Sequence, residues 1–258
     1  MTVFIALSVL LFLYAPLVAV AVFSVNQTRY GLTWGGWTWQ WYEGLFHNEV
    51  LWEMTRNTLV LACVSTLIST VLGTALALGL RKSAWGKRFH SILETALYLP
   101  VVTPDIILAA SLVIAFSALQ HVSNLFEPGM TTMILGHVTF QISFVTLVVQ
   151  SRLVSLGSEI EEAAYDLYAS YPACLFRVIL PLIFPGILAG AMLAFTLSLD
   201  DFIISLFTSG PDSQTLPLFI YGSLKRGVTP EVHALSTLIL GVTVVLVFVS
   251  ERLTRNRV

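Results

Sequence analysis

The chain has 258 residues, of which 56% are hydrophobic and only 11% are charged. An average soluble domain carries about 25% charged residues, so this composition excludes an ordinary water-soluble protein and suits lipid. The formal net charge of −2 gives no indication of a nucleic-acid partner. We therefore expect an integral membrane protein that is surrounded by lipid.

Six apolar windows are long enough to cross a membrane, which takes about 20 residues of helix. They are residues 3–25, 57–80, 91–118, 131–151, 182–207 and 233–250. The first has Ala19 and Ala21 placed like a signal-peptidase site, but it is too long for a signal peptide and follows no basic residue. We expect it to stay as a helix. With no internal repeat, the sequence predicts one all-α domain of six transmembrane helices over residues 1–258.

Most of the 13 Lys and Arg residues fall on one side of this topology. They lie in the loops after the second and fourth windows and in the C-terminal tail, which places these parts and both termini in the cytoplasm. The opposite loop, residues 26–56, is rich in tryptophan and includes Trp41. Such aromatic side chains either anchor the chain at the headgroup level or form a mouth that meets a cationic solute. Both interpretations stay open.

The longest cytoplasmic loop, residues 152–181, predicts a short helix of its own. Gly157 breaks the preceding helix, and Ser158 is placed to cap a new one with Glu161 as its capping-box partner. The pair Tyr171–Pro172 is expected to end this helix, because the residue before a proline avoids helical backbone.

One side of this short helix is predicted to dock on another protein. Its first turn is acidic, which complements the helix dipole. Ala163, Ala164 and Leu167 are three and four residues apart, so they predict a smooth face of small side chains. A helix of this kind suits a groove on a partner protein.

The same loop carries a resemblance to a known family. Glu162-Ala163-Ala164, followed at fixed spacing by Val178 and Leu180-Pro181, resembles the EAA loop of binding-protein-dependent ABC importer permeases. In that family this loop contains the coupling helix, which sits in a cleft of the cytoplasmic ATPase. The family has glycine at the position of Tyr168, where a positive φ permits a tight turn, so we expect a different turn and a different fit here. The resemblance implies contacts with the ATPase from Glu161, Glu162, Ala163, Ala164, Asp166, Leu167 and Tyr168.

No catalytic, metal-binding or nucleotide-binding pattern is present in the sequence. A glycine-rich loop ending in Gly-Lys-Ser/Thr is missing, so ATP hydrolysis is expected in another subunit. The chain is predicted to be no enzyme and to hold no cofactor, with ATP and Mg²⁺ bound by the partner ATPase. Cys63 and Cys174 are expected to be free thiols. The histidines are expected at membrane interfaces, and they are His47, His90, His121, His137 and His233.

Three aspartates lie inside apolar windows, where a charge costs about 2.5–3.5 kcal/mol and is a functional candidate by default. Asp105 follows two prolines that are expected to kink the third helix. Asp200 and Asp201 lie late in the fifth helix, and adjacent residues point about 100° apart, so one can face a solute path while the other bonds to a neighbouring helix. An alternative interpretation makes Asp105 and Asp201 hydrogen-bond partners between helices.

These segments also resemble one subfamily, the spermidine/putrescine importer permeases. The matching segments are Trp37 to Tyr42, Thr103 to Ile106, His137 to Phe140, Ser198 to Phe202, Thr215 to Pro217 and Gly227 to Glu231. The resemblance implies a bacterial inner-membrane location and alternating access. It implies a second homologous permease, an ATPase dimer, a periplasmic polyamine-binding protein and a polyamine substrate as partners. The residues it places along the solute path are Asp105, Asp200, Asp201, Trp41 and Phe140.

Two rival interpretations remain open from the sequence. One is the same machine with another solute, such as ferric ion or an inorganic anion. The other is a six-helix channel or membrane enzyme that needs no ATPase, and the EAA-like loop argues against it.

Overall fold

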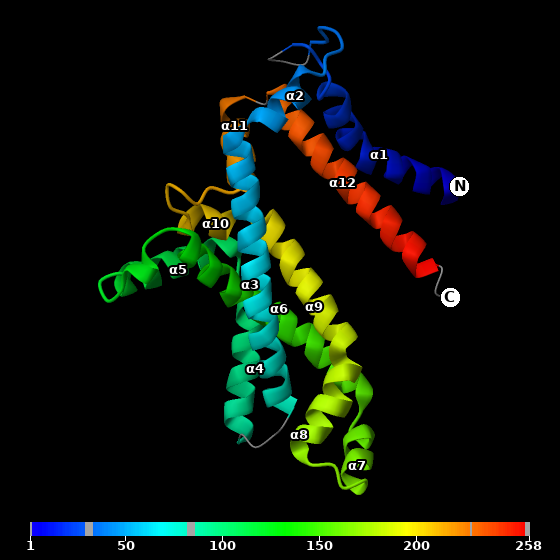
Figure 1. Cartoon of the computed structure of the whole chain (residues 1–258), viewed down its shortest axis with the longest axis vertical. Coiled ribbons are helices and arrows are strands. Elements are labelled where there is room, and N and C mark those ends of the chain that lie inside the picture. Colours follow the sequence, from blue (N-terminus) through cyan, green and yellow to red (C-terminus); the bar gives the residue numbers. More distant parts are fainter. Residues whose placement is uncertain (1, 29–32, 82–85, 228, 256–258) are drawn as a thin grey trace. The chain divides into compact units, whose positions relative to one another are not determined.

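The computed structural model describes residues 2–28, 33–81, 86–227 and 229–255. Over these ranges it is helical, apart from connecting loops and one isolated pairing of Asn26 with Trp37 (Figure 1). Val228, which belongs to one of the matching segments, lies outside the described residues, as do some of the basic residues used to predict orientation. The contacts divide the chain into two compact units, Met1–Glu53 with Phe219–Val258 and Met54–Leu218, and each is described by itself. The single-domain organisation stays a prediction.

The first unit contains the two ends of the chain. Its helices are α1 (Thr2–Phe23), α2 (Gln40–His47) and α12 (Pro230–Arg255), and α11 (Leu216–Arg226) reaches into it. α1 packs along α12, where the rings of Phe23 and His233 lie 6.2 Å apart. The side chain of Trp41 is fixed within this unit, because its Nε1 donates to the backbone oxygen of Asn26 at 2.8 Å.

The second unit is built on a long helix that begins just before it, α3 (Glu49–Arg81). The helices that follow are α4 (Lys87–Val102), α5 (Asp105–Leu119), η1 (Asn124–Phe126), α6 (Met130–Leu156), α7 (Glu159–Asp166), α8 (Tyr171–Cys174), the π-helical turn η2 (Leu175–Ile179), α9 (Leu180–Asp200) and α10 (Ile203–Thr208). α6 is the central helix of this unit and is the most buried of the long apolar helices.

Glycines let α3 and α9 approach α6 closely. A Cβ atom added at Gly73 on α3 would lie 2.8 Å from the Cβ of Val145 on α6, and one at Gly186 on α9 would lie 2.8 Å from the Cβ of Arg152. The oxygen of Gly73 also accepts a hydrogen bond from Thr146 Oγ1 at 3.2 Å. Close contact through small residues is typical of helices that associate in lipid.

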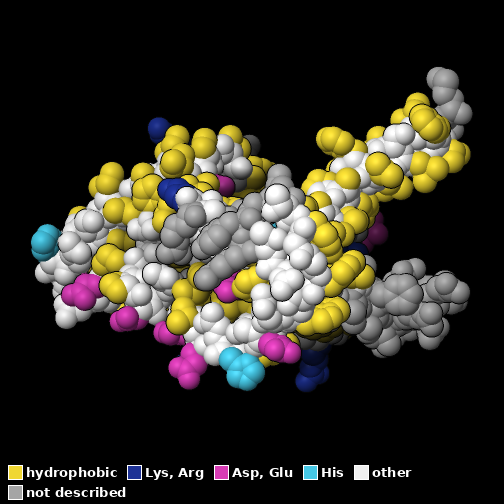
Figure 2. All heavy atoms as spheres, turned by 90° about the horizontal axis from the view of Figure 1, so that it is seen from above, with side chains coloured by type: hydrophobic (Ala, Val, Ile, Leu, Met, Phe, Trp, Pro, Cys, Tyr) yellow, Lys and Arg dark blue, Asp and Glu magenta, His cyan; other side chains and the backbone are white. Residues whose placement is uncertain are grey.

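Among the described residues, four helices are long and apolar enough to span a membrane. They match the first, second, fourth and fifth predicted windows, and hydrophobic side chains cover much of the face shown in Figure 2. The sixth window coincides with α12, whose side chains are described only in part. The fifth window was predicted to run to residue 207, but α9 ends at Asp200 and α10 follows it.

The third window differs most from its prediction. A continuous helix over 91–118 is wrong, because the chain breaks between α4 and α5 and the helix direction changes by 112° there. The break is visible in Figure 1. Pro104 immediately precedes α5, and Thr103 before it is extended, with ψ of 131°. A proline disfavours helical backbone in the residue before it, so the helix stops here instead of bending. If this bent pair is one span, the described residues contain five.

Candidate functional site

The cytoplasmic loop predicted from residues 152–181 contains the short helix α7, and an arginine from α3 holds its beginning. Gly157 ends α6 with φ of +69°, as expected. The predicted capping box is wrong, since Ser158 makes no side-chain cap hydrogen bond. Glu161 pairs instead with Arg81, with 3.3 Å between Oε1 and Nη1, and Arg81 Nη2 donates to the oxygen of Gly157 at 2.7 Å. A charged partner on α3 therefore takes the side chain that the capping box would have used.

The predicted face of small side chains on α7 is divided between two environments. Ala164 is 8% exposed and belongs to a core cluster with Leu153 and Cys174. Ala163 is exposed, and Leu167 is 82% exposed. The prediction that Ala163 and Ala164 present one docking face is wrong, because Ala164 seats the helix on its own chain. The exposed residues of the predicted contact set are Glu162, Ala163, Asp166, Leu167 and Tyr168.

Tyr168 ends α7 in the left-handed conformation that the family glycine was expected to need, with φ of +58°. Its N–H donates to the oxygen of Tyr165 at 2.9 Å, and the N–H of Ala169 donates to the oxygen of Ala164 at 3.0 Å. This pair of bonds is the Schellman motif. The expected change of turn is therefore wrong, and the ring of Tyr168 is 98% exposed. Tyr171–Pro172 does not end α7 but begins α8, where a proline is tolerated in the first turn.

Asp105 lies at the break between α4 and α5. It is the first residue of α5, directly after Pro104, and it is exposed. Thr103 Oγ1 donates to the oxygen of Leu99 at 2.6 Å, which completes the last turn of α4. The break thus presents a carboxylate next to the apolar end of α4 and the apolar remainder of α5.

The second break lies between α9 and α10, and it separates the two adjacent aspartates. Asp200 is the last residue of α9 and is exposed. Asp201 leaves the helix with ψ of 127°, and its side chain is only 10% exposed. Its Oδ2 accepts from both the N–H and the hydroxyl of Ser205 at 2.8 Å, and its Oδ1 accepts from the N–H of Ile204 at 3.3 Å. Asp201 therefore caps α10 from the end of α9.

The structure adds a residue that the sequence argument missed. His137 on α6 is fully buried, and its Nε2 lies 3.2 Å from Asp201 Oδ2. The expectation that all the histidines lie at interfaces is wrong for His137. Its position well inside the fourth apolar window was a usable signal, because a titratable side chain within a membrane helix is a functional candidate by the same rule that selected the aspartates.

Phe140, one turn along α6, belongs to the same part of the unit. Its ring lies 5.6 Å from that of His137, and it is 7% exposed in a cluster with Ala109 of α5 and Ile204 of α10. The structure therefore brings Phe140 and Asp201 together around His137. Asp200 immediately precedes Asp201 in the chain. Trp41 belongs to the first unit and is described only there.

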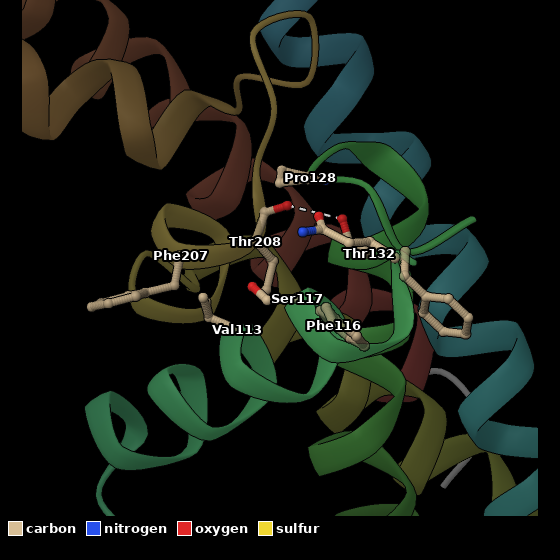
Figure 3. Close-up of a pocket in the computed structure, with 9 residues that line it drawn as sticks. Val113, Phe116, Ser117, Pro128, Thr132, Phe207 and Thr208 are labelled. Carbon is tan, nitrogen blue, oxygen red and sulfur yellow. Dashed lines mark hydrogen bonds between the residues drawn. The ribbon is translucent and has the colours of Figure 1, made fainter. Parts of the chain in front are cut away.

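A small cavity lies near this junction, between α5, α6 and α10. It measures about 30 Å³ and is lined in part by Phe116, Phe126 and Phe207. Figure 3 shows Thr132 and Thr208 joined across it by a hydrogen bond of 3.0 Å from Thr132 Oγ1 to the oxygen of Thr208. This is room for about one water molecule, so the cavity is too small for an organic solute. The hydrogen bond between Thr132 and Thr208 joins the end of α10 to the start of α6.

Residues 69–256 match a family described as the binding-protein-dependent transport system inner membrane component. The chain belongs to this family. It is 36% identical to the spermidine/putrescine transport system permease protein PotC of Haemophilus influenzae, over 95% of this chain and 93% of that protein. It is 38% identical to the putrescine transport system permease protein PotI of Escherichia coli, over 93% of this chain and 85% of that protein.

Solved structures agree on the fold of this transport component. A bacterial ABC transporter involved in the import of the acidic polysaccharide alginate has a TM-score of 0.77 and 19% identity, over 97% of this chain and 92% of that chain. A bacterial alginate ABC transporter in complex with an alginate pentasaccharide-bound periplasmic protein has a TM-score of 0.78, also at 19% identity, over 99% of this chain and 93% of that chain. The predicted all-α permease fold is confirmed. The chain is a multi-pass component of the inner membrane. Cys63 and Cys174 are both free, as expected.

Proposed function

We propose that this permease is a subunit of an ATP-driven importer that carries spermidine, putrescine or both into the bacterial cytoplasm. The observation that carries the proposal is the exposed carboxylate of Asp200 at the end of an apolar helix, beside Asp201, whose carboxylate is occupied within the chain. A mobile cation would offset the cost of a charge left open at such a place. The relatives are named as spermidine/putrescine and putrescine transport permeases, and this supports a polyamine as that cation.

Asp105 supplies a second carboxylate to the proposed path. It is exposed at the break between α4 and α5, and the backbone on either side of Pro104 leaves carbonyl groups outside regular helix. Trp41 is the aromatic candidate at the outer mouth, where an indole ring attracts an ammonium group. Phe140 is buried, so in this proposal it supports the packing of α5 and α10 instead of touching the solute. A second homologous permease supplies the other wall.

The exposed side of α7 is the proposed contact with a cytoplasmic ATPase dimer, which binds ATP and Mg²⁺. Glu162, Asp166 and Tyr168 are exposed there, while Ala164 and Arg81 join the helix to the rest of its unit. A push on α7 therefore reaches α3 and α6 through packed and charged contacts. We place both termini and α7 on the cytoplasmic side and a periplasmic polyamine-binding protein on the other.

The test is transport by the complete complex. The permease, its second permease, the ATPase and the binding protein are reconstituted in liposomes, and ATP-dependent uptake of labelled spermidine and putrescine is measured. We expect uptake of at least one polyamine, and we expect Asp200→Asn and Asp105→Asn to lower kcat/KM about tenfold, the effect of losing one charge-assisted contact.

Asp212→Asn is the matched control, because Asp212 is exposed in the loop after α10 and has no role in the proposed path. Its uptake is expected to equal that of the unaltered complex. ATP hydrolysis stimulated by the binding protein without polyamine uptake would show that the solute is wrong while the importer is right. Equal uptake by the Asp200 and Asp212 variants would remove Asp200 from the path.

A further inference from the structure

His137 is the only histidine on α6, and its ring is completely enclosed by the helices around it. Both ring nitrogens have partners: Nδ1 lies 2.8 Å from Ser198 Oγ on α9, and Nε2 lies 3.1 Å from Ser205 Oγ on α10 and 3.2 Å from Asp201 Oδ2. One buried ring thus touches both helices that meet at the α9–α10 break. Buried polar side chains are costly unless every group is paired, and here each nitrogen is paired.

The proton on Nε2 of His137 can be assigned from the donors and acceptors around it. The hydroxyl of Ser205 donates to Asp201 Oδ2, so Ser205 Oγ is left to accept from His137. His137 Nε2 therefore carries a proton, which points at both Ser205 and Asp201. Nδ1 is hydrogen-bonded to the hydroxyl of Ser198 at 2.8 Å. Asp201 fixes the ring, and the ring in turn holds Asp201 in its capping position.

The carboxylate of Asp201 is largely occupied within the chain, since Oδ2 faces three donors and Oδ1 one. It receives the N–H groups of Ile204 and Ser205, the Ser205 hydroxyl and the His137 ring. α10 has only six residues, and so short a helix depends on such contacts to form. Asp200, which precedes it in the chain, is exposed at the last turn of α9.

The hydrogen-bonded cluster extends to the long helices α3 and α6, which fix the position of the α9–α10 break. Ser198 Oγ lies 3.3 Å from Ser65 Oγ on α3. Gln141 on α6 donates to the oxygen of Ala194 on α9 at 3.1 Å and accepts from Ser69 on α3 at 3.0 Å. The position at which α9 ends is therefore set jointly by α3 and α6.

We infer that His137 is a positioning residue for polyamine transport, which acts through Asp201 to fix the end of α9 so that Asp200 alone offers its carboxylate to the solute. This inference rests on the proposed function. It separates the roles of the two neighbouring aspartates: Asp201 stabilises the local structure, and Asp200 binds the substrate.

The test measures KM and kcat for spermidine uptake by the reconstituted complex. His137→Leu fills the space but leaves Asp201 without its ring donor, and we expect KM to rise about tenfold while ATP hydrolysis stimulated by the binding protein is retained. His137→Gln places an amide N–H near Asp201 and should restore KM to within about threefold of the unaltered complex. His121→Leu is the matched control, because His121 is exposed in the loop after α5.

The decisive comparison combines two changes. If His137 acts through Asp200, adding His137→Leu to Asp200→Asn leaves KM as it is in Asp200→Asn alone, because the contact to be positioned is already gone. A further tenfold rise in the double variant, or a His137→Leu KM equal to that of His121→Leu, would overturn the inference. Should His137→Leu fail to assemble, Ser198→Ala, which removes the Nδ1 partner together with the contact to Ser65, is read in the same way.

The outcomes also separate this inference from the proposed function. Without polyamine uptake by the unaltered complex, the proposed function fails. With normal uptake and independent effects of His137 and Asp200, the proposed function stands and the positioning role fails.

Discussion

The α9–α10 junction and the segment around α7 (residues 157–168, the α7 segment) both lie between long helices and both concentrate carboxylates, but the surroundings of these side chains differ. At the junction, Asp201 is bonded to His137 and to the start of α10 inside the chain. In the α7 segment, Glu162 and Asp166 are exposed. Asp201 at the junction thus stabilises the fold of its own chain, whereas the carboxylates of Glu162 and Asp166 on α7 stay exposed. The role of an acidic residue here depends on whether the chain itself supplies its donors.

Removing the internal carboxylate is expected to have the largest effect on stability. Asp201→Ala leaves the His137 ring and the first N–H groups of α10 without their acceptor, so the free energy of unfolding should fall by about 3 kcal/mol. Asp105→Ala removes an exposed carboxylate and should change it by less than about 0.5 kcal/mol. Thermal unfolding in detergent, followed by tryptophan fluorescence, measures both. Equal effects would contradict the view that the junction depends on Asp201.

Substitution of Gly157, at the start of the α7 segment, tests whether the stability of that segment depends on backbone geometry. Its φ of +69° and ψ of 179° suit glycine alone, so Gly157→Ala should cost about 2 kcal/mol and expose the segment to proteolysis. Gly79→Ala is the control, because a Cβ atom at Gly79 within α3 meets nothing within 4 Å. That variant should gain about 0.5–1 kcal/mol from better helix propensity. A loss at Gly79 as large as at Gly157 would show that neither effect reflects φ.

Tyr168, at the other end of the segment, should give the smallest effect, and one of opposite sign. Tyr168→Gly relieves a left-handed conformation and should raise the free energy of unfolding by about 1 kcal/mol. Its exposed ring makes no contribution to the core, so the same change should weaken association with the ATPase, as measured by co-purification. Tyr168→Asn removes the ring with less change in the backbone. Unchanged association in both variants would exclude the ring from the contact.

Local patterns in the sequence predicted the apolar helices and the short helix α7 well. Length and hydrophobicity alone locate α1, α3, α6 and α9, because lipid demands long apolar helices. The prolines indicated a disturbance near Thr103, but not the 112° angle, since that depends on how α5 packs after the helix stops. The expected change of turn at Tyr168 is wrong because two backbone hydrogen bonds and the burial of Ala164 together outweigh the conformational cost of a left-handed residue.

The buried cluster at the junction lay beyond such patterns. Its members come from four helices, and Ser65 and Ser198 are 133 residues apart in the chain. The sequence did suggest that one aspartate of the pair bonds to a neighbouring helix. Only the structure shows that it is Asp201 and that His137 is its partner, because the choice depends on which side of α9 faces α6.

The close packing of α3 and α9 on α6 has a mechanical consequence. At Gly73 and Gly186 there is no room even for an added Cβ atom, so α3 and α9 lie in direct contact with α6. α6 has 27 residues and is therefore about 40 Å long. A tilt of about 5° would shift one end of such a rod by about 3 Å relative to the other. If α7 contacts the ATPase as proposed, α6 can carry a movement of this size from the end next to α7 to its other end.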